Sequence, residues 1–160
     1  MKIVKLNVVL TAVFVVITAF AVVVFNSPLR RLVAIVDLLL FAVGVAAFIW
    51  GYFSAVQRSR SDEISVAGLF LLIDGVASKS VMRIMNAALA VQVIIGLAGA
   101  IIRSSTDGVA GSTLAFGVLV PLLGLGLNGL WASKYGTFGK RVFGEVSAPE
   151  GEIGKDGDHG

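Results

Sequence analysis

The chain has 160 residues, of which 57% are hydrophobic and only 14% are charged, and its mean hydropathy is +0.94. A soluble domain of this size could not hide so much apolar surface, so the composition predicts a membrane protein. The net charge of +3 does not indicate nucleic-acid binding, because the basic residues flank hydrophobic runs instead of forming one compact patch.

Two residue types that carry chemistry are scarce. The chain has no cysteine, which excludes disulfides, thiolate metal sites and iron–sulfur clusters. Its single histidine, His159, is the penultimate residue of a polar tail. No histidine is therefore available inside the hydrophobic segments for haem, zinc or Ser–His chemistry. We predict no metal site, no cofactor and no catalytic residues.

The first hydrophobic run covers residues 8–25 and is broken only by Thr11 and Thr18. As a helix it would be about 27 Å long, close to the roughly 30 Å hydrocarbon core of a bilayer. A cleaved signal peptide is the alternative, because Ala19-Phe20-Ala21 is a weak cleavage site. The apolar run continues past that site, which favours a retained membrane span.

A second span is predicted over residues 32–56, after the interruption at Asn26-Ser27-Pro28. Ser27 is the expected helix cap, and Pro28 suits the first helical position. The end of this span is rich in residues that favour the lipid–water interface: Phe48, Trp50, Tyr52 and Phe53.

Residues 64–73 form an apolar run of ten residues between the charged loop 57–63 and Asp74-Gly75. Ten residues are too few to cross a bilayer. We expect a short interfacial or re-entrant helix docked on the bundle. The third span then covers residues 84–102, with Ser80 as the expected cap.

The fourth span, residues 112–133, carries no charge. Gly117, Pro121, Gly124 and Asn128 recur at i, i+4, i+7 and i+11, so on a helix they share one small and polar face. Pro121 removes a backbone hydrogen bond and crowds the carbonyl group of Gly117, so a kink is expected there. In lipid, such a face usually packs on another helix.

The third span has a matching face formed by Gln92, Gly96 and Gly99. We expect the two faces to pack together, with amide hydrogen bonds between the helices worth about 0.6–2 kcal/mol each. The alternative is a substrate path lined by Gln92 and by the asparagines of these spans, Asn86 and Asn128.

Asp37 is the only ionisable residue deep inside a predicted span. A carboxylate there costs up to about 2.5–3.5 kcal/mol, so it should face protein or water, be protonated, or have a partner. An ion pair near the interface is expected, with Arg30, Arg31 or Arg103 as the partner. The functional alternative is a site that handles protons or cations.

Charge asymmetry predicts the orientation. With four spans, ten lysine and arginine residues lie on the side of the termini and three, Arg30, Arg31 and Arg103, lie on the other. The positive-inside rule therefore places both termini in the cytoplasm. Residues 1–141 would form the membrane domain, and residues 142–160, which are acidic and rich in glycine, a disordered cytoplasmic tail.

Four stretches resemble a family of small actinobacterial integral membrane proteins of unknown function. They are RSRSDEISVAGLFLL (58–72), ALAVQV (88–93), LAFGVLVPLLGLGLNGLW (114–131) and the step KYGTF (134–138). The family pattern often has Arg-His-Gly at that step, whereas this chain has Lys134 and Tyr135, so no role of that histidine carries over. The resemblance implies four spans in a plasma membrane and brings no known activity.

The sequence thus predicts an all-α integral membrane protein of the plasma membrane. We expect it to act by association, as an accessory or structural subunit or as a homo-oligomer, and not as an enzyme. Its cytoplasmic basic segments should bind anionic lipid. The alternative is a small oligomeric transporter or channel that uses Asp37 with Gln92 and Asn128.

Overall fold

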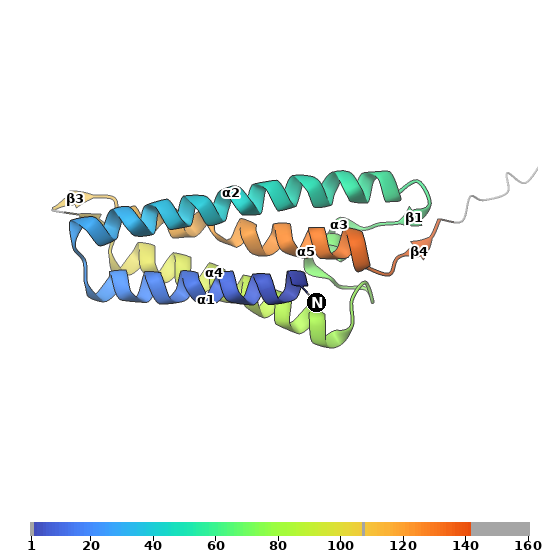
Figure 1. The fold of residues 1–160 in the computed structure, drawn as a ribbon, viewed down its shortest axis with the longest axis horizontal. Helices are drawn as coiled ribbons and strands as arrows, with labels where there is room; N and C mark the ends of the chain where they lie inside the picture. Colours follow the sequence, from blue (N-terminus) through green and yellow to red (C-terminus); the bar gives the residue numbers. More distant parts are fainter. Residues whose placement is uncertain (1, 107, 142–160) are drawn as a thin grey trace, which may run out of the picture.

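The computed structural model describes residues 2–106 and 108–141. Within these ranges the chain forms a bundle of four long helical segments that lie side by side (Figure 1). They are α1 (Lys2–Val23), α2 (Ser27–Arg58), α4 (Lys79–Ile102), and the 3-10 helix η1 (Thr113–Leu119) continued by α5 (Pro121–Tyr135).

Each predicted span coincides with one of these segments, and all four are long and apolar enough to cross a membrane. The prediction of an all-helical fold with four candidate spans is therefore confirmed, and it is compatible with a multi-pass membrane protein. The predicted tail, residues 142–160, lies outside the described residues.

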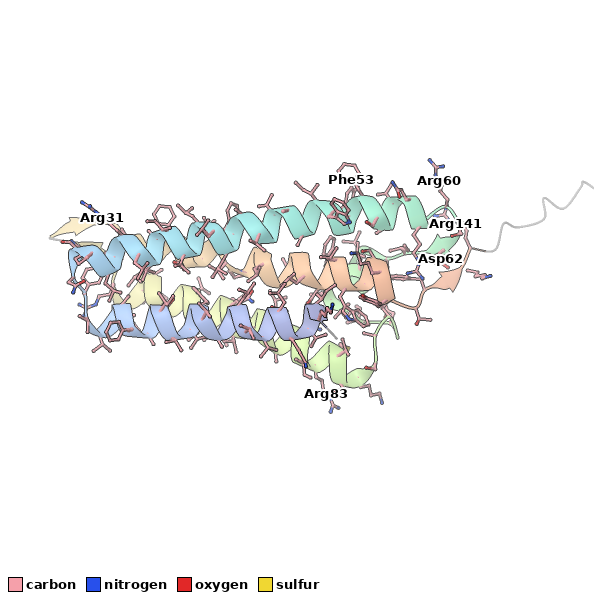
Figure 2. All side chains as sticks on the ribbon, viewed as in Figure 1. Arg31, Phe53, Arg60, Asp62, Arg83 and Arg141 are labelled. Atoms are coloured by element: carbon pink, nitrogen blue, oxygen red, sulfur yellow. The ribbon has the colours of Figure 1, made fainter. Side chains whose placement is uncertain are left out.

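The bundle has two distinct ends (Figure 1). The first, here called the proximal end, holds the start of α1 and two short strands, β1 (Asp62–Glu63) and β4 (Gly139–Lys140), which pair antiparallel. The distal end holds the turn between α1 and α2 and a hairpin of β2 (Ser105–Thr106) and β3 (Val109–Ala110). Figure 2 shows Arg60, Arg83 and Arg141 at the proximal end and Arg31 at the distal end.

Two helix caps differ from the prediction. Asn26, not Ser27, caps α2, because its backbone is extended and its side chain accepts a hydrogen bond from the amide of Leu29 at 3.0 Å. Ser78, not Ser80, caps α4 and accepts from the amide of Val81. The helices therefore begin one and two residues earlier, respectively, than the predicted caps imply.

The long helices bury one face each, at alternating steps of three and four residues. On α1 this face is largely polar: Asn7, Thr11, Phe14, Thr18 and Ala21. On α2 it comprises Val33, Asp37, Leu40, Gly44, Ala47, Gly51 and Ala55. On α4 it comprises Met85, Ala88, Gln92, Gly96 and Gly99. The remaining faces are covered with exposed apolar side chains.

The closest packing in the bundle is between α2 and α5. A Cβ atom on Gly44 would lie 2.5 Å from the backbone nitrogen of Leu123, and one on Gly51 would lie 2.7 Å from that of Leu130. Gly126 of α5 lies equally close to the backbone of α2 at Gly44. Because these positions lack side chains, the two backbones are in direct contact.

The short run 64–73 forms α3 (Val66–Leu71), which docks on α5 and does not cross the bundle. Ser65 caps its start by accepting from the amide of Gly68 at 2.9 Å. Its end turns sharply, with Leu72 in the left-handed conformation at φ 56°. The ring of Phe70 stacks on Phe48 of α2 with the centroids 4.6 Å apart. The docking that the sequence predicts is therefore observed.

The fourth segment changes helix type at Pro121. The chain runs as a 3-10 helix up to Leu119, and α5 begins at Pro121. The amide of Val120 donates to Gly117 at 3.2 Å, which satisfies the carbonyl group that a proline at position 121 cannot reach. The irregularity expected at Pro121 is thus a 3-10 to α transition.

Candidate functional site

Asp37 is buried in the core of the bundle, where 1% of its surface is exposed. Its Oδ2 atom lies against Gly117, 3.5 Å from the position that a Cβ atom would take there. Neither carboxyl oxygen has a hydrogen-bond partner among the described residues. A buried polar group without a partner normally costs free energy, so this carboxyl group requires an explanation.

The predicted ion pair of Asp37 with an arginine is wrong. Arg103 instead donates from Nε and Nη2 to the carbonyl oxygen of Val22, at 3.1 and 2.6 Å. Val22 is in the last turn of α1, where carbonyl groups lack helical partners, so Arg103 caps that helix. Arg30 bonds to Ser27 and lies over the ring of Phe25. Arg31 is exposed at the distal end.

Asp37 belongs to a layer that separates two groups of packed apolar side chains. On the distal side of this layer lie Ala21, Val33 and Leu114. On its proximal side lies the main core, which includes Phe14, Leu40 and Val120. Between them each long segment contributes a polar residue or a glycine. We call this set the polar layer: Thr18, Asp37, Gly96, Gly99 and Gly117.

The contacts within the polar layer are close. A Cβ atom on Gly117 would meet Asp37 and the Cα atom of Gly96 at 3.5 Å, and a Cβ atom on Gly99 would lie 3.1 Å from the methyl group of Thr18. The hydroxyl group of Thr18 has no hydrogen-bond partner within the described part of the chain. The layer therefore combines two buried polar groups without hydrogen bonds, those of Asp37 and Thr18, with glycines that let the segments pack closely.

Gln92 forms the centre of a second polar group, closer to the proximal end. Its Nε2 atom donates to Asn7 at 3.2 Å and to Thr11 at 2.6 Å, both on α1. Its Oε1 atom accepts from the backbone amide of Gly124 at 3.0 Å. That amide belongs to the first turn of α5, which has no side-chain cap. Gln92 therefore joins three segments: α1, its own helix α4, and the start of α5.

Asn128 makes an amide hydrogen bond of the kind expected between the third and fourth spans, and it also bonds to α3. Its Nδ2 atom donates to the carbonyl oxygen of Phe70 at 2.9 Å and to Oδ1 of Asn86 at 3.0 Å. Asn86 in turn donates to the carbonyl oxygen of Leu71 at 2.6 Å. The two asparagines thus hold the last carbonyl groups of α3, a six-residue helix with no basic residue in its final turn.

Most of the predicted packing between the small faces of the third and fourth spans is observed. Gly96 lies on the backbone of Gly117, where an added Cβ atom would be 2.5 Å from its carbonyl oxygen. Gly124 lies on Gln92 and Leu89. Gly99 instead faces α1. Gln92 and Asn128 belong to separate hydrogen-bond networks, and neither bonds to Asp37.

Several important residues were not singled out in the sequence. Asn7 and Thr11 hold Gln92, and Gly44 and Gly51 allow α2 to contact α5. Both pairs belong to a periodic pattern in the sequence. The polar residues 7, 11 and 18 share one helical face, and residues 37, 44 and 51 recur every seven positions.

The outer surface of α1 and α4 carries shallow hollows. One of about 390 Å³ lies near the proximal end and is lined by Thr11, Ala12, Ala87 and Ala88 among others. Another, of about 320 Å³, lies near the distal end and is lined by Thr18, Ala19, Ala98 and Gly99 among others. We call them the proximal hollow and the distal groove. Small side chains form much of both.

The described residues contain no cluster of three or more acidic, histidine or cysteine side chains that could hold a metal ion. Comparison with protein families, curated proteins and solved structures found no match. The resemblance to actinobacterial membrane proteins therefore stays a prediction.

Proposed function

We propose that the protein is a four-span integral protein of the plasma membrane with both termini in the cytoplasm. Four apolar helices and a band of exposed apolar side chains support the membrane location. Of the lysine and arginine residues that the structure describes, nine lie toward the proximal end and three at the distal end, which supports the orientation. The proximal lysine and arginine residues would each add about 1 kcal/mol of attraction to anionic lipid.

Within the membrane the protein acts by association, as an accessory or structural subunit or as a homo-oligomer, with no catalytic activity. The observation that carries this proposal is the proximal hollow. Ala12 of α1 and Ala87 of α4 are exposed there, and a second hollow of about 360 Å³ lies on the other side of Ala12. Small residues on a lipid-facing surface let another helix approach closely.

Gly124 is unsuitable as a contact point for a partner because it is buried against Gln92 and Leu89 of the same chain. We therefore propose the exposed surface of α1 and α4 as the partner surface.

Cysteine crosslinking in native membranes tests this proposal, because the chain has no cysteine of its own. Ala12→Cys and Ala87→Cys should each give a crosslinked species of defined mass. Ala46→Cys, an exposed alanine on α2, is the matched control and should remain monomeric. If all three variants give the same monomer band, the proposed surface is wrong.

A small transporter or channel is the second candidate, favoured by the unbonded carboxyl group of Asp37. Gln92 and Asn128 support it less, since their hydrogen bonds already join parts of the bundle. In vesicles with an enclosed pH dye, the wild type should dissipate an imposed pH gradient faster than protein-free vesicles. Asp37→Asn should abolish this difference, and Asp74→Asn, at an exposed site, should not. Equal rates for the wild type and Asp37→Asn would contradict a role for Asp37.

A further inference from the structure

The distal groove differs from the proximal hollow in having a positive charge at its mouth. Its walls are apolar and come from both helices: Ala19, Val22 and Val23 of α1, and Ile95, Ala98 and Ile102 of α4. Arg103 follows directly on the last of these, and its guanidinium group bonds to the carbonyl oxygen of Val22. The charge is therefore fixed where the groove opens at the distal end.

The guanidinium group of Arg103 retains donors for a ligand. An arginine has five N–H groups, and the two recorded bonds use Nε and Nη2 only. Within the described ranges no carboxylate pairs with Arg103, and its Nη1 atom has no partner. The ring of Phe25 lies under the guanidinium group at 4.8 Å and holds its plane. Among the described residues the charge is thus held in position without an acidic partner.

Below Arg103 the groove is apolar. Thr18 lines it one helical turn, about 6 Å, below Val22, but only 3% of the residue is exposed and its hydroxyl oxygen is buried. The groove therefore offers a cation at its mouth and apolar walls beneath it.

This order of groups matches an anionic phospholipid, whose phosphate is anionic and whose acyl chains are apolar. We propose that the distal groove binds one anionic phospholipid, with the phosphate on Arg103 and an acyl chain along Ala19 and Ala98. Arginine suits this role because it presents several donors to the phosphate oxygens.

The site is separate from the proposed association surface, which lies in the other half of α1 and α4. Either can fail without the other. A helix of a second copy in the distal groove is the competing occupant, and it would have no need of the charge of Arg103.

Lipid binding to the purified full chain in detergent tests this inference by native mass spectrometry, with phosphatidylglycerol as the probe and phosphatidylcholine as the comparison. The wild type should retain one phosphatidylglycerol preferentially. Arg103→Gln should weaken that binding about tenfold or more, since a charged hydrogen bond is lost. Arg31→Gln removes the same charge from an exposed position at the same end and should leave binding unchanged.

Because Arg103 also caps α1, a second variant leaves it in place. Ala19→Trp fills the groove from its exposed side and should displace the lipid while the helical content is unchanged. Equal binding by Arg103→Gln and Arg31→Gln, or full binding by Ala19→Trp, would overturn the proposal. The proposal would also be overturned if Ala19→Trp abolished a crosslinked dimer and left lipid binding unchanged, because a second copy would then occupy the groove.

Discussion

The side chain of Gln92 accepts a hydrogen bond from the backbone amide of Gly124, 3.0 Å away, at the first turn of α5. A Cβ atom on Gly124 would lie 2.7 Å from that Oε1 atom, so the contact requires glycine. The contact lies three residues after Pro121, where the 3-10 helix is replaced by α5. One amide side chain thus links α1 and α4 to the fourth segment near the point where that segment changes helix type.

Replacing Gln92 by leucine should lower the free energy of unfolding by about 1–3 kcal/mol. The leucine fills a similar volume, but the amide of Gly124 and the side chains of Asn7 and Thr11 lose their partner. Unfolding of the purified protein in mixed micelles measures the change. Gln57→Leu, at an exposed position on α2, is the control and should change stability by less than about 0.5 kcal/mol. Similar values for the two variants would show that the network contributes nothing measurable.

The contact between α2 and α5 predicts a strong effect of a single methyl group. Gly44→Ala would place a Cβ atom 2.5 Å from the backbone nitrogen of Leu123, and backbone cannot move aside as a flexible side chain can. We expect a loss of about 1–3 kcal/mol from overpacking, measured by thermal unfolding in detergent.

Gly139→Ala is the matched control for Gly44→Ala, because nothing lies within 4 Å of its added Cβ atom. It should leave the melting temperature unchanged. A Gly44→Ala variant as stable as Gly139→Ala would mean that the two helices separate easily and that their packing is not the core of the fold.

The hydrogen bonds from Asn86 and Asn128 to α3 predict that α3 can be released while the rest of the bundle stays folded. Asn128→Leu removes the bond to the carbonyl oxygen of Phe70 and leaves Asn86 with one partner fewer. Amide hydrogen exchange should speed up in residues 66–71, whereas exchange in α1 should be unchanged. Equal protection of α3 in the variant and the wild type would show that the stacking of Phe70 on Phe48 suffices to dock it.

The sequence predicts the four helical segments and the small faces of the third and fourth because both depend on local periodicity. Gly96, Gly117 and Gly124 are in contacts that this periodicity indicates. The partners of Gln92 are harder to predict, since Asn7 lies 85 residues away and only the arrangement of α1 beside α4 brings them together. The same holds for Asn128, which bonds to a helix of six residues that has too little periodicity to place.

The arginine partner expected for Asp37 failed for a related reason. Spacing along α2 can place Arg30 and Arg31 at the same end as Asp37, but it cannot show that Arg103 is already engaged with α1. The guanidinium group donates to the carbonyl oxygen of Val22 in the last turn of α1, and this contact forms only when α1 ends beside α4. Carbonyl groups at helix ends need such partners in the folded chain, and sequence periodicity does not show which side chain supplies them.

For the Asp37→Asn variant we expect stability and function to change in opposite directions, with stability kept or raised while the dissipation of a pH gradient is lost. Neither carboxyl oxygen makes a hydrogen bond to the described residues, so Asp37→Asn removes no native bond and relieves the cost of burying an acidic group. The variant should be as stable as the wild type or more stable, by up to about 2 kcal/mol, in the mixed-micelle assay. Asp74→Asn, at an exposed position, should have no effect. A clear loss of stability in Asp37→Asn would show that Asp37 is a structural residue with a partner. A gain would mean that the chain retains this acid at a cost to its own stability, which is characteristic of a functional residue.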